Sequence, residues 1–392
     1  MMTRPRTLAI VLAGGKGSRL EALTQFRAKP AVPYGGHHRL VDVSLSNCVH
    51  SGLSDVWVSV QYNPISLVEH LANGRPWDLD RNKGGLLVLP PRQGADRAGW
   101  ASGTADGLWR NAELIRRFDP ELLLVVSADA VYRLDYSDVV QQHLDSGATL
   151  TAVTTRVDRE DASRYGVVQV EDGRITDYQL KPDEPQNDLV CNEVFVFEPK
   201  TTLDLLDSLA EQADEEEGLQ DLGHGLLPAL VEQGGAREYR FDGYWRDVGT
   251  LEAYHDSHMD LLGENPAFEI DAPDWPLLTR GGRRGPTRLV EGARLDDVLL
   301  SASTKVGGEV ARSVISPGVL VEPGAVVRDS VLLHDVVVRS GARVERAVVD
   351  AGTEILGDAH IGGEGDLVLI GQEQRISGRI EPGGRQSGRE EP

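Results

Sequence analysis

The stretch that decides the fold is LAIVLAGGKGSRL, at residues 8–20. Its first six residues form an apolar run, which predicts a strand buried on both faces of a parallel sheet. The run stops at Gly14 and Gly15, and a basic loop containing Gly17 follows. Glycines allow positive φ and let main-chain N–H groups approach an anion closely. The spacing matches neither the P-loop nor the Gly-x-Gly-x-x-Gly fingerprint of dinucleotide binders, so it predicts a phosphate-binding turn of another kind.

Composition narrows the class of protein. The chain has 392 residues, which is enough for two or three domains, and 40% hydrophobic with 26% charged residues is typical of a globular protein. A net charge of −22 argues against nucleic acid or an anionic membrane as a partner. The two cysteines, Cys48 and Cys191, form no disulfide framework and no metal-binding spacing, which favours the cytoplasm. The apolar run at 8–13 is too short for a secretory signal, and no other run reaches membrane length.

Residues 1–272 alternate between two kinds of pattern. Residues 56–60, 122–126 and 149–154 are β-rich, whereas residues 111–118 and 139–144 have helical patterns. Such alternation predicts an α/β domain with a Rossmann-like mixed, mostly parallel sheet. Ligands of such sheets bind beyond the carboxyl ends of the strands. We therefore expect the site where apolar runs end.

A second domain is predicted from a repeat after the linker at residues 273–286. Aliphatic residues recur every six positions and slip once by one residue, at Val314, Leu320, Val326, Leu332, Val338 and Val344 and then at Val349, Ile355, Ile361 and Leu367. This period predicts a parallel β-helix of hexapeptide repeats over residues 287–371. Residues 372–392 are polar and rich in glycine, so we expect a disordered tail there.

Several motifs after the first strand carry a more specific resemblance. They are RAKPAVP at 27–33, GG at 35–36, RLVD at 39–42 and LSN at 45–47. The chain resembles the sugar-1-phosphate nucleotidyltransferases, and among them the bacterial glucose-1-phosphate adenylyltransferases, over nearly its whole length. The resemblance implies a left-handed β-helix and a homotetramer or other homo-oligomer. It also implies Mg²⁺-dependent conversion of ATP and glucose 1-phosphate to ADP-glucose and pyrophosphate, for glycogen or α-glucan synthesis.

The resemblance also assigns roles to individual residues. Arg19 and Lys29 match the phosphate-binding basic pair, and two fixed cations beside an amide-rich loop can neutralise charge developing on a triphosphate. Asp129 follows the apolar run at 122–126, and Asp247 lies in YWRDVGT at 244–250. Both are expected to bind Mg²⁺, which prefers carboxylate and phosphate oxygens. The predicted catalytic residues are therefore Arg19, Lys29 and Asp129.

Further matching segments predict the two substrate subsites. The nucleotide-binding residues implied by the resemblance are Leu12, Ala13, Gly14, Gly15, Gly17, Gln93, Gly103 and Thr104. The residues implied on the side of the sugar phosphate are Gly166, Lys181 and Cys191, with Lys181 as a point charge on the phosphate.

The sequence departs from the family pattern mainly on the sugar side. Leu180 replaces a glutamate, Ala130 replaces a histidine, and Cys191, Asn192 and Glu193 replace Ser-Met-Gly. Replacing a hydrogen-bonding group by an apolar one weakens discrimination, so we expect ordinary ATP binding and weaker use of glucose 1-phosphate. Two alternatives therefore stay open: that the enzyme uses another sugar 1-phosphate or nucleotide, and that the chain is a non-catalytic regulatory subunit.

Overall fold

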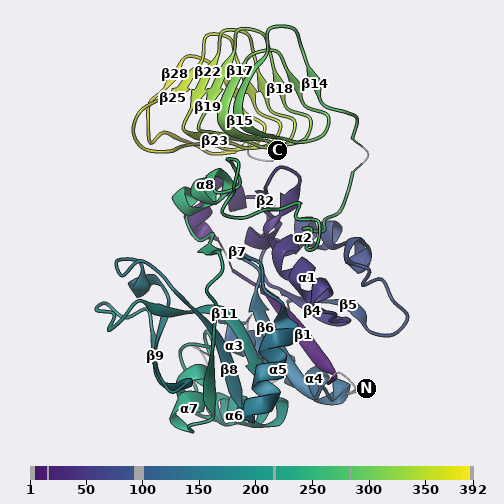
Figure 1. The fold of residues 1–392 in the computed structure, drawn as a ribbon, viewed down its shortest axis with the longest axis vertical. Coiled ribbons are helices and arrows are strands. Elements are labelled where there is room, and N and C mark those ends of the chain that lie inside the picture. Colours follow the sequence, from purple (N-terminus) through teal and green to yellow (C-terminus); the bar gives the residue numbers. More distant parts are fainter. Residues whose placement is uncertain (1–4, 16, 92–100, 215–217, 283, 389–392) are drawn as a thin grey trace.

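The computed structural model describes residues 5–15, 17–91, 101–214, 218–282 and 284–388. Figure 1 shows an α/β domain with a β-helix stacked on one end of it. The predicted fold class, a mostly parallel α/β domain followed by a left-handed β-helix, is confirmed.

The α/β domain is built on a sheet that has nine strands in the described residues. Their spatial order is β5 (Gly85–Leu89), β4 (Asp55–Val60), β1 (Thr7–Ala13), β6 (Leu122–Ser127), β11 (Leu189–Phe197), β8 (Leu150–Arg156), β12 (Ala236–Arg240), β10 (Arg174–Leu180) and β9 (Gly166–Glu171). The strands from β5 to β6 pair in parallel, whereas β11 runs antiparallel to both β6 and β8. The sheet is therefore mixed, and its parallel half contains the strand that opens the chain.

Helices connect the strands and cover the sheet. They are η1 (Ser18–Thr24), η2 (Lys29–Ala31), α1 (Leu40–His50), α2 (Pro64–Leu71), η3 (Ala72–Trp77), α3 (Thr104–Arg110), α4 (Ala112–Phe118), α5 (Tyr136–Ser146), η4 (Ala162–Arg164), α6 (Pro199–Gln212), α7 (Leu226–Glu232) and α8 (Leu251–Met259). Local signals set their ends. For example, the Asp135 side chain accepts a hydrogen bond from the Ser137 N–H at the start of α5, and Gly147 ends that helix with φ +60°. No helix in the described part of the chain is long and apolar enough to cross a membrane.

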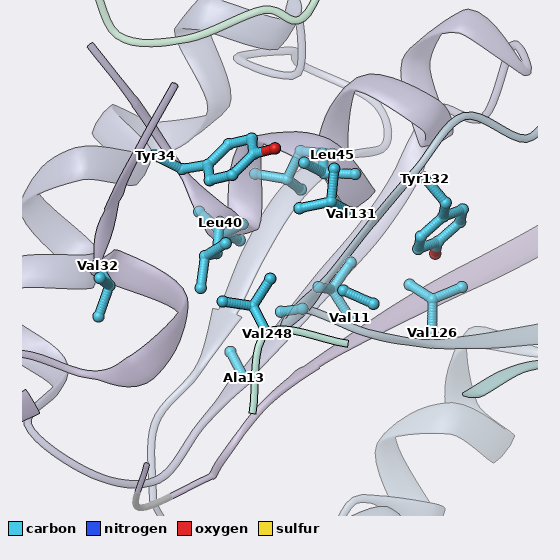
Figure 2. Close-up of a cluster of buried hydrophobic side chains, with 14 of the residues drawn as sticks. Val11, Ala13, Val32, Tyr34, Leu40, Leu45, Val126, Val131, Tyr132 and Val248 are labelled. Carbon is cyan, nitrogen blue, oxygen red and sulfur yellow. The ribbon is translucent and has the colours of Figure 1, made fainter. Parts of the chain in front are cut away.

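The residues of β1 alternate between two apolar clusters. Ala9 and Val11 face a cluster that includes Leu45 of α1, whereas Leu8 and Ile10 face another that includes helix α4. Figure 2 shows the first cluster, in which Val11 lies among side chains from the neighbouring elements. Because both faces of the strand are buried, the sequence is apolar without interruption, as the opening stretch predicted.

Two small ribbons lie outside the large sheet. Strand β2 (Pro33–Tyr34) pairs with β3 (His38–Arg39), and β7 (Ala130–Tyr132) pairs antiparallel with β13 (Trp245–Asp247). The second ribbon joins the end of β6 to a segment more than a hundred residues later.

The β-helix consists of short parallel strands stacked in coils. They are β14 (Arg288–Leu289), β15 (Arg294–Leu300), β16 (Lys305–Val306), β17 (Glu309–Ile315), β18 (Leu320–Val321), β19 (Val326–Arg328), β20 (Val331–Leu332), β21 (Val337–Val338), β22 (Arg343–Glu345), β23 (Ala347–Val349), β24 (Glu354–Ile355), β25 (His360–Gly362), β26 (Val368–Ile370), β27 (Arg375–Ile376), β28 (Arg379–Ile380) and β29 (Arg385–Gln386). Three columns of aliphatic side chains fill its interior. They are Val310, Val327, Val344 and Ile361; Ile315, Leu332, Val349 and Ile370; and Val321, Val338, Ile355 and Ile376.

This arrangement corrects two expectations. In the central coils the turns are six, six and five residues long, so the pattern repeats there every 17 residues and the buried positions include Val321 and Val327. The predicted positions Leu320 and Val326 are only half-buried. The expectation of a disordered tail from residue 372 is also wrong up to residue 388, because Ile376 and Ile380 pack on the apolar interior and continue the coils.

The β-helix is packed against the α/β domain. Val331, Leu333, Val348 and Leu369 belong to the same buried cluster as Val11 of β1. Asp350 of the β-helix forms an ion pair with Arg27, with 3.0 Å between Oδ1 and Nη1, and Arg385 pairs with Glu21. Arg27 lies between Arg19 and Lys29, so the β-helix contacts the segment that carries both predicted catalytic cations.

Candidate functional site

A cavity of about 400 Å³ opens beyond the carboxyl ends of β1 and β6. One side, here the β1–β6 wall, is formed by Gly14, Gly15, Gly17, Ser18, Arg19, Lys29, Ser127, Asp129 and Asp247. The facing side, here the β10–β11 wall, is formed by Tyr178, Leu180, Lys181, Cys191, Asn192, Glu193 and Phe195. The cavity therefore lies where the parallel part of the sheet was expected to bind a ligand.

The centre of the β1–β6 wall is the ammonium group of Lys29. This side chain is buried, and its Nζ lies 2.6 Å from Oδ2 of Asp129 and 3.9 Å from Oδ1 of Asp247. The hydroxyl of Ser127 donates a hydrogen bond to the other oxygen of Asp129. Burial opposes the charge on Lys29, but the two aspartates outweigh it and raise the lysine pKa. Lys29 is therefore a fixed positive charge.

The β7–β13 ribbon explains why the two aspartates meet. Asp247 is directly opposite Ala130 in the ribbon, next to Asp129, and the N–H of Val248 donates to the carbonyl oxygen of Asp129 at 3.1 Å. Asp129 and Asp247 are far apart in the sequence. Main-chain hydrogen bonds of the ribbon thus hold both carboxylates next to the ammonium group of Lys29.

The two aspartates differ in electrostatics. Burial raises the pKa of both groups, but Lys29 holds the pKa of Asp129 below its usual value. The pKa of Asp247 is raised, because burial and the charge of Asp129 outweigh Lys29 there. A cation between the carboxylates would relieve this repulsion, so the pair fits a divalent metal ion. No group of three potential His, Cys, Asp or Glu ligands is assembled in the described ranges, so this pair leaves further positions to phosphate oxygens and water.

Glycines allow the basic groups to approach closely. A Cβ on Gly17, which has φ +68°, would lie 2.9 Å from Cβ of Lys29. A Cβ on Gly249 would lie 2.5 Å from Oδ2 of Asp247 and 3.1 Å from a guanidinium nitrogen of Arg19. Side chains at either position would therefore displace the charged groups of the β1–β6 wall.

The predicted sugar-phosphate residues also line the cavity. Lys181 is exposed, and its N–H donates to the carbonyl oxygen of Tyr165 at 2.9 Å. Gly166 lets the ring of Tyr178 approach, since a Cβ there would lie 2.5 Å from the tyrosine oxygen. Burial raises the pKa of the Cys191 thiol, so this side chain presents an uncharged surface.

The predicted nucleotide-binding residues divide into three groups. Leu12, Gly14, Gly15, Gly17 and Thr104 line the main cavity. A smaller adjoining cavity of about 40 Å³ shares Leu12, Gly14 and Thr104 and adds Gly103. Ala13 instead packs in the apolar core, and Gln93 lies outside the described residues.

Thr104 is anchored by contacts from another part of the chain. Its N–H and its hydroxyl both donate to Oδ1 of Asp221, at 3.0 and 3.1 Å. The segment that precedes α3 is thereby fixed against residues 220–221, at the junction of the two cavities.

Among the polar residues of the cavity that sequence reasoning did not select as site residues are Arg164, Asn192 and Glu193. Arg164 lies 3.9 Å from Oδ2 of Asp247, whereas Lys29 lies nearest to Oδ1 of the same carboxylate. Asn192 and Glu193 lie in the middle of β11, in the run LVCNEVFVF. The polar pair in an otherwise apolar strand was the available signal, whereas Arg164 ends the short helix η4 within a polar stretch of sequence and gave none.

Comparisons with known proteins agree with this geometry. Residues 8–264 match the nucleotidyl transferase family, and residues 287–367 match the GlmU-like C-terminal hexapeptide family. A glucose-1-phosphate adenylyltransferase of Thermomicrobium roseum is 42% identical over 356 residues, covering 90% of this chain and 82% of that protein. Proteins of the same name from Thermotoga neapolitana (40%, 82% of this chain and 76% of the relative) and Bacillus cereus strain Q1 (34%, 95% and 100%) are also similar.

The chain belongs to the glucose-1-phosphate adenylyltransferase family. It is a nucleotidyltransferase, and its β-helix matches the GlmU-like C-terminal hexapeptide region.

The chain departs from the sequence pattern of the glucose-1-phosphate adenylyltransferase family at several positions, and these positions face the cavity. Leu180 is on the β10–β11 wall, and Ala130 lies beside Asp129 on the facing side. Glu193 also lines the cavity, and burial together with Asp129 and Asp247 raises its pKa to about 7. The departures therefore change the chemistry of the site itself, mostly on one wall.

Proposed function

We propose that the chain transfers the adenylyl group of ATP to glucose 1-phosphate, forming ADP-glucose and pyrophosphate. The observation that carries the proposal is the group formed by Lys29, Asp129 and Asp247 at the carboxyl edge of the sheet. The names of relatives at 34–42% identity over most of the chain support the choice of substrates.

The reaction needs little covalent chemistry from the protein. A phosphate oxygen of the sugar phosphate attacks the α-phosphorus of ATP, a new P–O bond forms, and the bond to pyrophosphate breaks. Negative charge develops on the α-phosphoryl and the leaving oxygens, so positioning and electrostatic stabilisation supply most of the rate. In this proposal Arg19 and Lys29 neutralise the triphosphate, and Lys181 holds the sugar phosphate as a point charge.

Asp129 and Asp247 are proposed to hold Mg²⁺. The bound ion supplies charge neutralisation that neither carboxylates nor amides can provide. Lys29 keeps Asp129 ionised, and the ribbon that joins the aspartates fixes their separation.

A second candidate is the same transfer with another sugar 1-phosphate. It is favoured by Leu180, which faces the cavity and offers no hydrogen bond where the family pattern has a carboxylate. A site that loses a bonding group to a substrate hydroxyl discriminates less well for that hydroxyl.

The decisive experiment measures pyrophosphate release by the purified chain with Mg²⁺ over a panel of nucleoside triphosphates and sugar 1-phosphates. Turnover highest with ATP and glucose 1-phosphate supports the main proposal, and a preference for another sugar supports the second candidate. Binding of ATP without turnover of any sugar 1-phosphate would contradict both and indicate a regulatory subunit.

The proposal includes the oligomeric state of the protein and its cellular compartment. We expect a homotetramer or other homo-oligomer, with the stacked coils of the β-helix as a rigid element of the assembly. We also expect the protein in the cytoplasm, where ATP is available and the free cysteines Cys48 and Cys191 remain reduced.

A further inference from the structure

Strand β11 contains one residue that breaks its pattern. Every residue of the strand is buried except Glu193, whose side chain is accessible to solvent from the cavity although protein atoms surround its carboxyl group. Glu193 has φ +61°, which is uncommon for a residue other than glycine, and the register of β11 against β8 shifts between Cys191 and Phe195. Such bulges redirect a side chain, and strained backbone of this kind collects at functional sites. The bulge therefore turns a carboxylate out of a buried strand and into the cavity.

The residue before it provides a second, independent observation. Asn192 is 1% exposed and lines the same cavity. Neither its amide nitrogen nor its amide oxygen has a hydrogen-bond partner among the described residues. A buried amide without a partner is unfavourable, so this side chain is suited to a ligand that can both donate and accept hydrogen bonds.

The surroundings of the pair define the chemistry of that ligand. Lys181 and Arg164 also line the cavity and can hold a phosphate. Leu180, Phe195 and Leu227 add an apolar surface, which suits the C–H groups of a sugar ring. The ligand thus has an anionic end, an edge of hydroxyl groups and an apolar face, which together describe a sugar phosphate.

We propose that Asn192 and Glu193 of β11 bind the hydroxyl groups of the sugar, in place of a carboxylate on β10. Glu193 accepts hydrogen bonds from one or two hydroxyls, and the Asn192 amide donates to or accepts from a neighbouring one. The inference rests on the proposed function, because it assigns specificity residues for the same sugar 1-phosphate. In this way a chain with Leu180 on β10 would recognise the sugar through polar groups on β11 instead.

The experiment combines variants with deoxy analogues. Glu193→Gln and Asn192→Ala are compared with wild type for kcat/KM of glucose 1-phosphate and of its 2-, 3-, 4- and 6-deoxy forms. Because hydrogen bonds to charged groups are among the stronger ones, we expect Glu193→Gln to lower kcat/KM about 10- to 100-fold. The analogue lacking the bonded hydroxyl should show a similar loss with wild type and little further loss with the variant. At saturating Mg²⁺, which limits the effect of losing the Glu193 charge near Asp129 and Asp247, the KM for ATP should change less than about twofold.

The matched control is Glu171→Gln, an exposed glutamate of β9 that does not line the cavity. It should leave every parameter unchanged, and thermal unfolding of each variant shows whether it is folded. If Glu193→Gln lowers kcat/KM by the same factor for glucose 1-phosphate and for every deoxy analogue, no single hydroxyl is bound by Glu193 and the proposal is overturned. So would an increase in glucose 1-phosphate use by Leu180→Glu while Glu193→Gln has no effect, since recognition would then belong to β10.

Failure of the proposed function is distinguished by equilibrium binding. If wild type releases no pyrophosphate with any sugar 1-phosphate, calorimetric titration with glucose 1-phosphate and the four analogues replaces the kinetics. The pair is supported as a hydroxyl-binding site if Glu193→Gln weakens binding of glucose 1-phosphate but causes little further loss for one deoxy analogue. Equal binding by wild type and both variants contradicts it.

Discussion

The two walls of the cavity hold their polar groups in opposite ways. On the β1–β6 wall, Lys29, Asp129 and Ser127 are already bonded to one another, and the β7–β13 ribbon adds Asp247. On the β10–β11 wall, Asn192 has no partner among the described residues, and Glu193 is held in a strained backbone conformation. The first wall is organised before a ligand arrives, as electrostatic stabilisation of a transition state requires. The second is completed by the ligand, as expected where selectivity rather than rate is decided.

The largest expected effect is at the aspartates of the β1–β6 wall. Asp129→Asn or Asp247→Asn should lower kcat/KM roughly a thousandfold, because an amide does not supply the charge that binds the metal. Pyrophosphate release measures the loss, and circular dichroism checks folding. Asp358→Asn, at an exposed position of the β-helix, serves as the control. Near-normal turnover in either aspartate variant would contradict the assignment.

The next effect tests whether the β-helix supports the β1–β6 wall. Asp350→Asn removes one partner of a buried ion pair and leaves Arg27 without a counter-charge, which should lower the free energy of unfolding by about 3 kcal/mol. Denaturant titration measures it. The control is Asp335→Asn in an exposed pair with Arg284, where we expect a change below about 1 kcal/mol. Equal losses in both variants would show that the buried pair has no special role.

Substitutions at two glycines distinguish the effect of backbone strain on turnover from the effect of displacing Lys29. Gly17→Ala and Gly147→Ala both place alanine at positive φ, so each should lose about 1–2 kcal/mol of stability. Only at Gly17 does the new Cβ meet Lys29, because nothing lies within 4 Å of a Cβ at Gly147. Turnover should therefore fall about tenfold in the first variant and stay unchanged in the second. A similar fall in both would attribute the effect to strain alone.

The smallest expected effect on stability is at Glu193 on the opposite wall. Glu193→Gly removes the left-handed strain and one negative charge near the aspartates, and should raise the free energy of unfolding by about 1 kcal/mol while sugar use falls. Glu193→Gln keeps the strain and tests the charge alone. Since burial, Asp129 and Asp247 raise the pKa of Glu193 from 4.5 to about 7, its contribution to stability is full below pH 4.5 and is lost as the pH rises through 7. The melting temperature of metal-free wild type should therefore fall relative to Glu193→Gln between pH 5 and 8, and parallel curves would contradict this.

The sequence predicted the fold where the pattern was unambiguous. The uninterrupted run of β1 allowed only a strand buried on both faces, and six-residue spacing indicated the β-helix. The phase of the coils was missed because Leu320-Val321 and Val326-Val327 are pairs of aliphatic residues, so that either member fits a six-residue repeat. The sequence showed one five-residue step, from Val344 to Val349, but its recurrence in the earlier coils, as from Val310 to Ile315, shows only when the main-chain register is known.

The residues of the candidate site were likewise predictable where they stand in sequence motifs and not where their placement depends on the tertiary structure. Arg19, Lys29, Asp129 and Asp247 stand in motifs, and the structure brings them to one cavity. The direction in which Glu193 points depends on a bulge and a positive φ, which composition does not reveal. Arg164 reaches Asp247 only through tertiary packing.

The sharing of one apolar cluster by β1 and by coils of the β-helix has a consequence for unfolding. Val331 and Val348 lose their buried environment if the α/β domain opens, and Val11 belongs to the same cluster. Neither part can melt without exposing the other, so heating should produce a single cooperative transition in calorimetry, although the architecture has two parts. A repeat structure that ordinarily unravels from its ends is here tied to the stability of the domain that contains the cavity.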